Sequence, residues 1–404
     1  MRERALRAIA ECRHIATMTE DPGQITRRFL TPPTHQVHAH LRARMEALGL
    51  SVHVDAAGNL RGRSKTSGKR LLLGSHIDTV PNAGAFDGVL GVTLALQCLD
   101  MGREMALPLA IDVVAFSEEE GVRFGVPFLG SRAVAGRFDP ALLRLKDETG
   151  HTMAESIRTY GLDPDQIPAA ALLEEQLGFL EIHIEQGPVL EAEDLSVAAV
   201  SGIVGQTRLT IEFSGQANHA GTTPMHLRFD ALAGAAEWIV AVEKQAKCTD
   251  GLIATVGRIG ASPNAGNVIA GAVVVSLDVR HLHDPIRQSA VIEMIDAANA
   301  LAERRGLAML CTRQMDQPAV SMDEKLTAYL VESMEVAGLT QKTMPSGAGH
   351  DAMVMAACMP TAMLFLRSPG GISHNPAESV REEDVEAALL VMRGFLERFA
   401  TDIR

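Results

Sequence analysis

Five histidine and carboxylate residues stand at or just beyond the ends of apolar runs, and their types are those of metal ligands. They are His76, Asp87, Glu120, His183 and His374. Imidazole nitrogen and carboxylate oxygen without a thiolate suit Zn²⁺ or Mn²⁺ with positions left open for water or substrate. Each residue alone is more often a helix cap or a core residue, and only their recurrence together indicates a metal site.

Five ligands exceed the need of one catalytic ion, which predicts a two-metal site with one shared carboxylate. Each ion would take a histidine, the shared carboxylate and one further ligand. Asp87 is the expected bridge, because it lies in a loop between a strand and a helix. Asp78, two residues past His76, is expected to fix the tautomer of that imidazole from outside the ligand set. A solvated or capping aspartate is the alternative for Asp78.

The glutamates 118–120 follow a β-branched run, and adjacent side chains cannot all reach one ion. We assign Glu120 as a ligand and Glu119 as the general base, which takes a proton from water whose pKa the ions lower. For Glu118 we expect a solvated position or the negative first turn of a helix. A shift of one residue in this assignment stays open.

Apolar runs that end in polar residues recur along the chain and set the expected positions of these side chains. The segment 70–78 predicts such a strand, followed after a loop by a helix over 88–102. The segments 107–121, 178–188 and 361–378 repeat the form. In open α/β sheets, ligand sites lie beyond the carboxyl ends of the strands, so we expect four strand ends to converge on one crevice.

Length and composition narrow the classes of protein. A chain of 404 residues exceeds what one core usually supports, which predicts two domains. The net charge of −13 argues against a nucleic-acid or anionic-membrane partner. The five cysteines are scattered, which argues against a disulfide framework and a thiolate zinc site. Without an apolar leader or a membrane-length apolar stretch, we expect a cytoplasmic protein with a small-molecule partner.

The segment 206–316 differs from the rest of the chain in its predicted order of elements, which is strand, helix, two strands, helix and strand. This order predicts a ferredoxin-like split unit, a four-stranded antiparallel sheet with two helices on one face. We therefore expect a discontinuous catalytic domain of residues 1–205 and 317–404, with 206–316 inserted in one of its loops. Open edges of the inserted sheet favour pairing of two copies into a homodimer.

The ordered set of motifs resembles the M20 family of di-metal amidohydrolases, from about residue 10 to the end of the chain. The set comprises HID, FDG, EEEG, HIEQGP, GQANHAGTTPM and GGISHNPAE. Within the family, HIEQGP, NHAGTTPM, GAGHDA and SHNPAE resemble the branch of allantoate amidohydrolases, N-carbamoyl-L-amino-acid hydrolases and β-ureidopropionases. The resemblance implies a mixed-sheet catalytic domain and an inserted ferredoxin-like lid and dimerisation domain.

The resemblance also implies how the ligands are grouped. Two divalent ions, Zn²⁺ or Mn²⁺, would bind each subunit. His76 and His183 would complete one half of the site, with Asp87 shared. Glu120 and His374 would hold the second ion.

Further roles follow from the same resemblance. Glu119 matches the catalytic base of the family, and Gln186 matches a glutamine of this branch that contacts substrate. The family's cis peptide after the bridging acid would fall between Asp87 and Gly88.

Three residues of the inserted segment match positions that reach the substrate in the family. His219 is expected to contact substrate and a reaction oxyanion, supplied by the neighbouring subunit, and Asn267 to contact substrate. Arg280 is expected to clamp a substrate carboxylate in bidentate fashion. A surface arginine and a turn-shaping Asn–His pair are the alternatives.

The implied activity is hydrolysis of a ureido C–N bond, with release of ammonia and carbon dioxide. Allantoate is the expected substrate, with N-carbamoyl-L-amino acids and β-ureidopropionate as alternatives. An aminopeptidase or deacylase of the same family is a further alternative. A metal-dependent binding protein that had lost turnover would not need Glu119, so the presence of this residue argues against that class.

Overall fold

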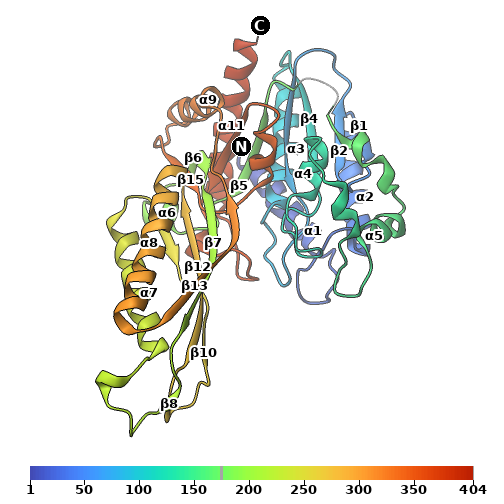
Figure 1. The fold of residues 1–404 in the computed structure, drawn as a ribbon. Coiled ribbons are helices and arrows are strands. Elements are labelled where there is room, and N and C mark those ends of the chain that lie inside the picture. The colour runs from blue at the N-terminus through green and yellow to red at the C-terminus, as the bar shows by residue number, and fades with distance from the viewer. Residues whose placement is uncertain (173–175, 404) are drawn as a thin grey trace. The chain divides into compact units, whose positions relative to one another are not determined.

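The computed structural model describes residues 1–172 and 176–403, and it divides into two compact units (Figure 1). The first unit comprises Met1–Ser201 and Ser321–Arg404, and the second comprises Gly202–Val320. Each unit has its own hydrophobic core. No helix within the described ranges has the length and apolar content needed to cross a membrane.

In the described part of the chain, nine strands form a mixed sheet in the order β1-β2-β4-β3-β5-β16-β6-β14, and β15 pairs with β6. They are β1 (Leu50–Val54), β2 (Leu60–Ser64), β3 (Arg70–His76), β4 (Ala110–Phe116), β5 (Phe179–Ile184), β6 (Val197–Ile203), β14 (Val320–Ser321), β15 (Thr343–Ser346) and β16 (Thr361–Leu366). The neighbouring strands β4, β3, β5 and β16 are parallel and buried along their whole length. Their carboxyl ends share one edge of the sheet, which confirms the predicted convergence.

The helices of the first unit are α1 (Arg2–Ala16), α2 (Pro32–Ala47), α3 (Val89–Glu104), α4 (Leu129–Val134), α5 (Met153–Tyr160), α6 (Val189–Ala192), α9 (Glu324–Val336), α10 (Asp351–Met355) and α11 (Glu382–Asp402). Short 3₁₀ turns span Pro140–Arg144, Pro164–Ala170 and Pro369–Gly371. Helix α3 packs against β3, β4 and β5, and nearly all of its residues are buried. A helix that is apolar all round belongs inside a core. The loop before α3, which carries Asp87, is therefore anchored at one end by the core.

The second unit has the element order β-α-β-β-α-β when β9 and β10 are counted as one interrupted strand. Its elements are β7 (Gly205–Ser214), α7 (Ala231–Cys248), β9 (Ile253–Thr255), β10 (Ile259–Ser262), β12 (Ala272–His281), α8 (Asp284–Arg305) and β13 (Ala308–Gln317). A 3₁₀ turn spans Met225–Leu227, and β8 (Asn218–His219) pairs with β11 (Val268–Ile269). The larger sheet is antiparallel in the order β10-β12-β7-β13, with β9 on β12. The chain between α7 and β12 leaves strand conformation between β9 and β10, where Gly257 offers no side chain to pack.

Protonation of the buried His38 is expected to destabilise the first unit. Burial lowers the pKa of His38 to about 3, and His35 and Arg42 act in the same direction. The stabilisation is fully present above the unfolded pKa of about 6.5 and is lost as pH falls toward 3, because the unfolded chain binds the proton first. We expect His38→Gln to remove about 2 kcal/mol of the loss of stability between pH 7 and pH 5. Urea unfolding of both proteins at these pH values measures the difference, and an equal pH dependence would contradict it.

Candidate metal centre

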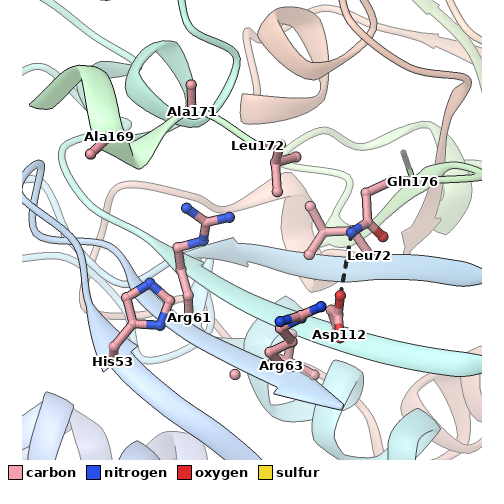
Figure 2. Close-up of a pocket in the computed structure, with 11 residues that line it drawn as sticks. His53, Arg61, Arg63, Leu72, Asp112, Ala169, Ala171, Leu172 and Gln176 are labelled. Carbon is pink, nitrogen blue, oxygen red and sulfur yellow. Dashed lines mark hydrogen bonds between the residues drawn. The ribbon is translucent and has the colours of Figure 1, made fainter. Parts of the chain in front are cut away.

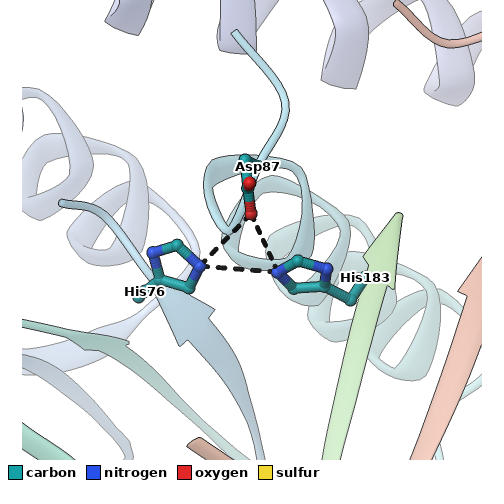
Figure 3. Close-up of side chains that lie close together, drawn as sticks. All are labelled: His76, Asp87 and His183. Carbon is teal, nitrogen blue, oxygen red and sulfur yellow. Dashed lines mark hydrogen bonds and ion pairs between the residues drawn. The ribbon is translucent and has the colours of Figure 1, made fainter. Parts of the chain in front are cut away.

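The first cluster brings together His76, Asp87 and His183 (Figure 3). His76 ends β3 and His183 lies near the end of β5, while Asp87 stands in the loop before α3. Asp87 Oδ1 lies 3.5 Å from His76 Nε2 and 3.3 Å from His183 Nε2. The two Nε2 atoms are 3.4 Å apart, and all three side chains are buried.

The hydrogen bonds around this cluster fit a divalent cation. His76 Nδ1 lies 3.1 Å from the carbonyl oxygen of Asp78, and His183 Nδ1 lies 2.9 Å from that of Ile184. A carbonyl only accepts, so each Nδ1 carries the proton and each Nε2 presents a lone pair. Asp87 Oδ1 is buried and accepts no hydrogen bond from the described residues. A bound cation would satisfy three acceptor atoms that face one another in this way.

Asp87 also belongs to a second cluster, with Glu120 and His374. His374 Nε2 lies 3.3 Å from Asp87 Oδ2 and 3.4 Å from Glu120 Oε1. The contact with Asp87 raises the pKa of His374 to about 9. Burial, aided by the charge of Asp87, raises the pKa of Glu120 to about 7. The two oxygens of one carboxylate thus face two separate groups of metal-binding side chains.

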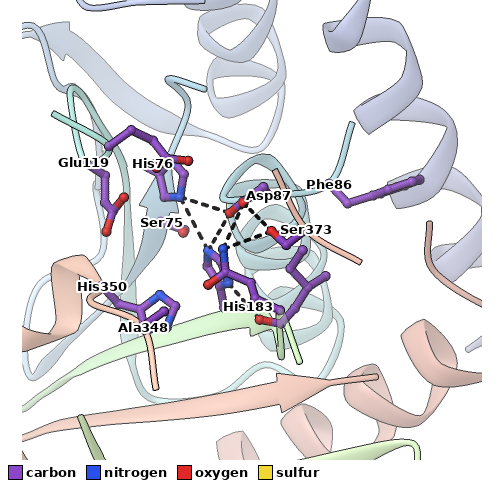
Figure 4. A network of polar contacts seen from close by, with 12 residues as sticks. Ser75, His76, Phe86, Asp87, Glu119, His183, Ala348, His350 and Ser373 are labelled. Atoms are coloured by element: carbon purple, nitrogen blue, oxygen red, sulfur yellow. Dashed lines mark hydrogen bonds and ion pairs between the residues drawn. The ribbon is translucent and has the colours of Figure 1, made fainter. Parts of the chain in front are cut away.

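Glu119 lies beside His76 on the edge of the clusters (Figure 4). Glu119, Glu120 and His76 each offer an atom within 4.8 Å of the others. Burial raises the pKa of Glu119 well above its usual value, although the charge of His76 opposes the shift. A buried carboxyl group with a raised pKa, next to groups that can bind a cation, is suited to accept a proton.

Asp78 connects His76 to the glutamate loop. Its Oδ1 lies 3.5 Å from His76 Nδ1. Its carboxylate also accepts hydrogen bonds from the backbone N–H groups of Glu119, at 3.0 Å, and Glu120, at 3.1 Å. The Asp78 carboxylate therefore binds the backbone of both glutamates and also lies close to the imidazole of His76.

The expectation of a solvated or helix-capping Glu118 is wrong. Glu118 is 0% exposed, and its backbone has a φ of +49°. Its carboxylate accepts hydrogen bonds from the backbone N–H groups of Phe29, at 3.1 Å, and Arg123, at 2.8 Å. Burial raises the pKa of Glu118 to about 8. Glu118 therefore turns into the interior, where the backbone N–H groups of Phe29 and of Arg123 in its own loop receive its carboxylate.

The expectation of a cis peptide between Asp87 and Gly88 is also wrong: this bond is trans. The cis bond in the described part of the chain is Ser262–Pro263. Glycine is nevertheless required at position 88. Its φ is +67°, and a Cβ built there would lie 2.4 Å from ring atoms of His76. The close approach of this backbone to His76, with the bond trans, accounts for the glycine.

Three residues from other loops hold Asp87. Gln186, expected to contact substrate, donates from Nε2 to Asp87 Oδ2 at 2.9 Å. Ser373 Oγ donates to the same oxygen at 2.9 Å. Glu378 Oε1 accepts a hydrogen bond from the backbone N–H of Asp87 at 3.0 Å. Ser373 and Glu378 were not predicted from the sequence, although both lie close to His374 in the motif GGISHNPAE.

Buried His350 and Glu181 adjoin His183, and neither was predicted as a site residue from the sequence. The ring centroids of His350 and His183 are 4.5 Å apart. Burial, and then the charge of His183, lower the pKa of His350 well below its usual value. Glu181 accepts from Ser75 Oγ at 2.7 Å and from the backbone N–H of Ala352 at 2.9 Å. Both oxygens of Glu181 accept hydrogen bonds, whereas Asp87 Oδ1 accepts none from the described residues, so this group suits a cation less than the cluster of His76, Asp87 and His183.

The predicted residues of the second unit lie in two places, of which the first is the pair β8 and β11. His219 in β8 pairs with Val268, and the carbonyl of Asn267 accepts a hydrogen bond from the N–H of Ala220 at 2.9 Å. The N–H of Gly221 donates to His219 Nδ1 at 3.1 Å. The neutral ring therefore carries its proton on Nε2, which leaves this exposed residue able to donate.

The second place is β12, where Asp278 orients Arg280. Arg280 Nε donates to Asp278 Oδ1 at 2.9 Å, and Nη2 donates to Oδ2 at 3.1 Å. Arg208 Nε also donates to Asp278 Oδ2, at 3.0 Å. The two arginines thus share one carboxylate, and Arg280 holds it with two nitrogens.

A pocket of about 240 Å³ lies elsewhere on the first unit, over β2 and β4 (Figure 2). Asp112 in this pocket accepts hydrogen bonds from Arg70 Nε at 2.8 Å and Gln176 Nε2 at 3.3 Å. Its lining contains none of the predicted ligands or substrate contacts. The predicted metal ligands therefore lie around Asp87 and not in this pocket.

The chain matches known proteins over most of its length. The model of Peptidase family M20/M25/M40 matches residues 72–398. Allantoate deiminase of Arabidopsis thaliana is 36% identical, over 96% of this chain and 81% of that protein. N-carbamoyl-L-amino acid amidohydrolase of Geobacillus stearothermophilus is 36% identical, over 90% of each. A crystal structure of an amidase of the hydantoinase/carbamoylase family from Burkholderia multivorans has a TM-score of 0.91 and 30% identity, over 98% of this chain and 97% of that one. With this family match and these relatives, the chain belongs to peptidase family M20/M25/M40.

Proposed function

We propose that this chain is a metal-dependent amidohydrolase that cleaves the ureido C–N bond of a small carboxylate, with allantoate as its substrate. The observation that carries the proposal is Asp87, whose two oxygens face two clusters of metal-binding side chains with Glu119 alongside. The names of the Arabidopsis and Geobacillus relatives, an allantoate deiminase and an N-carbamoyl-L-amino acid amidohydrolase, support this substrate class.

The proposed ligand set binds two divalent ions, Zn²⁺ or Mn²⁺. His76 and His183 would hold one ion and Glu120 with His374 the other, with Asp87 between them. When bound, such ions polarise a carbonyl group and lower the pKa of water. The donor set, nitrogen and oxygen without sulfur, suits either metal.

The residues of the chain would divide the remaining work. Glu119 takes a proton from the water that attacks the carbamoyl carbon, and it returns this proton to the leaving nitrogen. His219 donates from Nε2 to the oxyanion that forms. Gln186 and Asn267 contact the substrate, and Arg280 binds its carboxylate. One ureido group and one water give one amine, one ammonia and one carbon dioxide, so the atoms balance.

We propose that residues 206–316 form a lid and dimerisation domain on a catalytic domain of residues 1–205 and 317–404. Strand β13 is an edge of its sheet, and Leu310 on this strand is exposed. Edge strands pair readily with a second copy, and His219 would then serve the neighbouring subunit. Light scattering is expected to give a dimer, and a monomer at working concentrations would contradict the role of His219 in the other subunit.

Replacing Arg280 by lysine is expected to raise KM about 10- to 100-fold with little change in kcat. Lysine keeps the charge but loses the planar pair of donors that matches a carboxylate. Arg208→Lys is the matched control, because Arg208 also contacts Asp278 but is proposed to have no role in substrate binding. Steady-state kinetics of the three proteins measure the effect, and equal KM values for both variants would remove Arg280 from the site.

Two related activities use the same proposed site. An N-carbamoyl-L-amino acid or β-ureidopropionate carries one ureido group and one carboxylate, and the Geobacillus relative favours the first. An aminopeptidase or deacylase would use the same ions on an amide bond. The proposed base Glu119 separates both activities, and allantoate hydrolysis with them, from a binding protein without turnover.

The test is ammonia release by protein stripped of metal and reloaded with Mn²⁺ or Zn²⁺. The substrates are allantoate, several N-carbamoyl-L-amino acids and β-ureidopropionate, with a dipeptide and an N-acetyl amino acid assayed for amine release. Metal-dependent release from allantoate is the expected result. Release from carbamoyl amino acids alone would transfer the activity to that class, and cleavage of the dipeptide or acetyl amino acid alone would overturn the ureido reading.

A further inference from the structure

The segment Ile25–Leu30 joins the two loops that carry candidate metal ligands, although it lies outside the residues that the family model matches. Its main chain pairs with the loop that follows β3. The N–H of Arg27 donates to Thr79 Oγ1 at 2.9 Å, and the N–H of Thr79 donates to the carbonyl of Arg27 at 2.9 Å. The N–H of Ala83 donates to the carbonyl of Ile25 at 2.8 Å. The segment therefore runs along the loop that leads from His76 toward the bridging carboxylate.

Arg27 is a buried arginine whose side chain donates hydrogen bonds to backbone carbonyls. Its Nε donates to the carbonyl of Ile77 at 2.5 Å, and Nη1 donates to the carbonyls of Met18 at 3.0 Å and Ile15 at 3.4 Å. Ile15 lies in the last turn of α1 and Met18 just after it, where the carbonyl groups form the negative end of the helix dipole. Ile77 directly follows the proposed ligand His76. One buried cation thus ties a helix end to the backbone beside a metal ligand.

Glu118 fixes the glutamate loop to the same segment. Its Oε2 accepts from the N–H of Phe29 at 3.1 Å, and its Oε1 accepts from the N–H of Arg123 at 2.8 Å. Arg123 Nη1 returns a hydrogen bond to the carbonyl of Phe29 at 2.6 Å. The N–H and the carbonyl of Phe29 therefore both form hydrogen bonds with the loop that carries Glu119. Two buried charged side chains, Arg27 and Glu118, thus connect this segment to the loops of the candidate site.

We infer that Arg27 and Glu118 are positioning residues that set the distance between the loop of His76 and the loop of Glu120, and with it the affinity and geometry of metal binding. Both act through backbone groups and need no contact with an ion. Replacing such outer partners of metal ligands typically costs about 10- to 100-fold in metal affinity or activity. The inference rests on the proposed function only in requiring that the site binds metal.

The test measures metal binding and not turnover. Arg27→Met keeps the length of the side chain but removes its charge and donors. We expect it to weaken Co²⁺ binding by about 10- to 100-fold in competition with a chromophoric chelator, and to change the visible absorption of the Co²⁺-loaded protein. Arg27→Lys keeps the charge and several donors and should restore part of the affinity. Glu118→Gln, which can accept only one of the two hydrogen bonds, should shift affinity and spectrum in the same direction.

Arg287 in the second unit offers the matched control. It is also 1% exposed, and it pairs with Asp284 at 2.9 Å and Asp316 at 2.5 Å. Arg287→Met should lower thermal stability while leaving Co²⁺ affinity and spectrum as in the wild type. Equal loss of metal in Arg287→Met and Arg27→Met would show general destabilisation and overturn the inference.

The remaining outcomes separate this inference from the proposed function. Wild-type affinity and spectrum in the folded Arg27 and Glu118 variants would also overturn the inference, even if the enzyme hydrolyses ureido substrates. If Arg27→Met does not fold, Glu118→Gln decides the matter by the same two measurements. Wild-type protein that binds Co²⁺ and releases no ammonia would overturn the proposed function alone.

Discussion

Replacing Glu119 by glutamine is expected to lower kcat about 10³-fold while metal content stays at the wild-type level. The amide has the shape of the carboxylate but cannot take a proton from water or return it to a leaving nitrogen. Glu119 is 7% exposed and belongs to neither cluster around Asp87, so its loss leaves those ligands in place. Steady-state kinetics and elemental analysis of the purified variant measure the two quantities.

A conservative variant sharpens this result. Glu119→Asp keeps the carboxylate but shortens the side chain, and it should fall between the wild type and Glu119→Gln in kcat. Unchanged turnover in Glu119→Gln would remove the assignment of the base and direct attention to its neighbour Glu120. Loss of metal in Glu119→Gln would instead make this residue a ligand.

Replacing Asp87 by asparagine is expected to deplete both ions, because this one carboxylate faces both clusters. The amide keeps the size of the side chain and can still accept hydrogen bonds from Gln186 and Ser373. It loses the charge and the second oxygen that a bridge requires. We expect kcat/KM to fall by about 10³-fold or more, since Lewis-acid stabilisation is worth several kcal/mol and each 1.4 kcal/mol is tenfold.

His374→Asn is the matched variant for the bridge. His374 belongs to only one of the clusters that contain Asp87, and its side chain is 48% exposed, so the fold should tolerate the change. We expect it to lose one ion and Asp87→Asn to lose two, as measured by elemental analysis after gel filtration. Equal metal content in the two variants would contradict the shared role of Asp87.

The positions of the candidate ligands could be predicted because these residues stand at or just beyond the ends of apolar runs that form buried strands. His76 and His183 lie at the ends of buried parallel strands, and a parallel sheet brings such ends to one edge whatever the intervening sequence. The motifs then predicted the family, and the match to residues 72–398 confirms it. Local sequence patterns were sufficient to predict those residues whose position depends only on the direction of a strand.

Contacts between loops could not be predicted in the same way. Glu118 meets Phe29 across 89 positions of sequence, and Glu378 meets Asp87 across 291. Neither the periodicity nor the spacing of residues in the sequence indicates such pairs, because they depend on how several loops pack at the edge of the sheet. The same holds for Gly88, where the short approach to His76 requires glycine although the peptide bond is trans.

A metal titration followed by activity tests the central claim most directly. Protein stripped of metal is titrated with Mn²⁺, and both bound metal and ammonia release from allantoate are measured at each step. The site around Asp87 predicts no turnover without metal and full turnover as bound metal reaches about two ions per chain. Full turnover in the presence of excess chelator, with no metal bound, would contradict it.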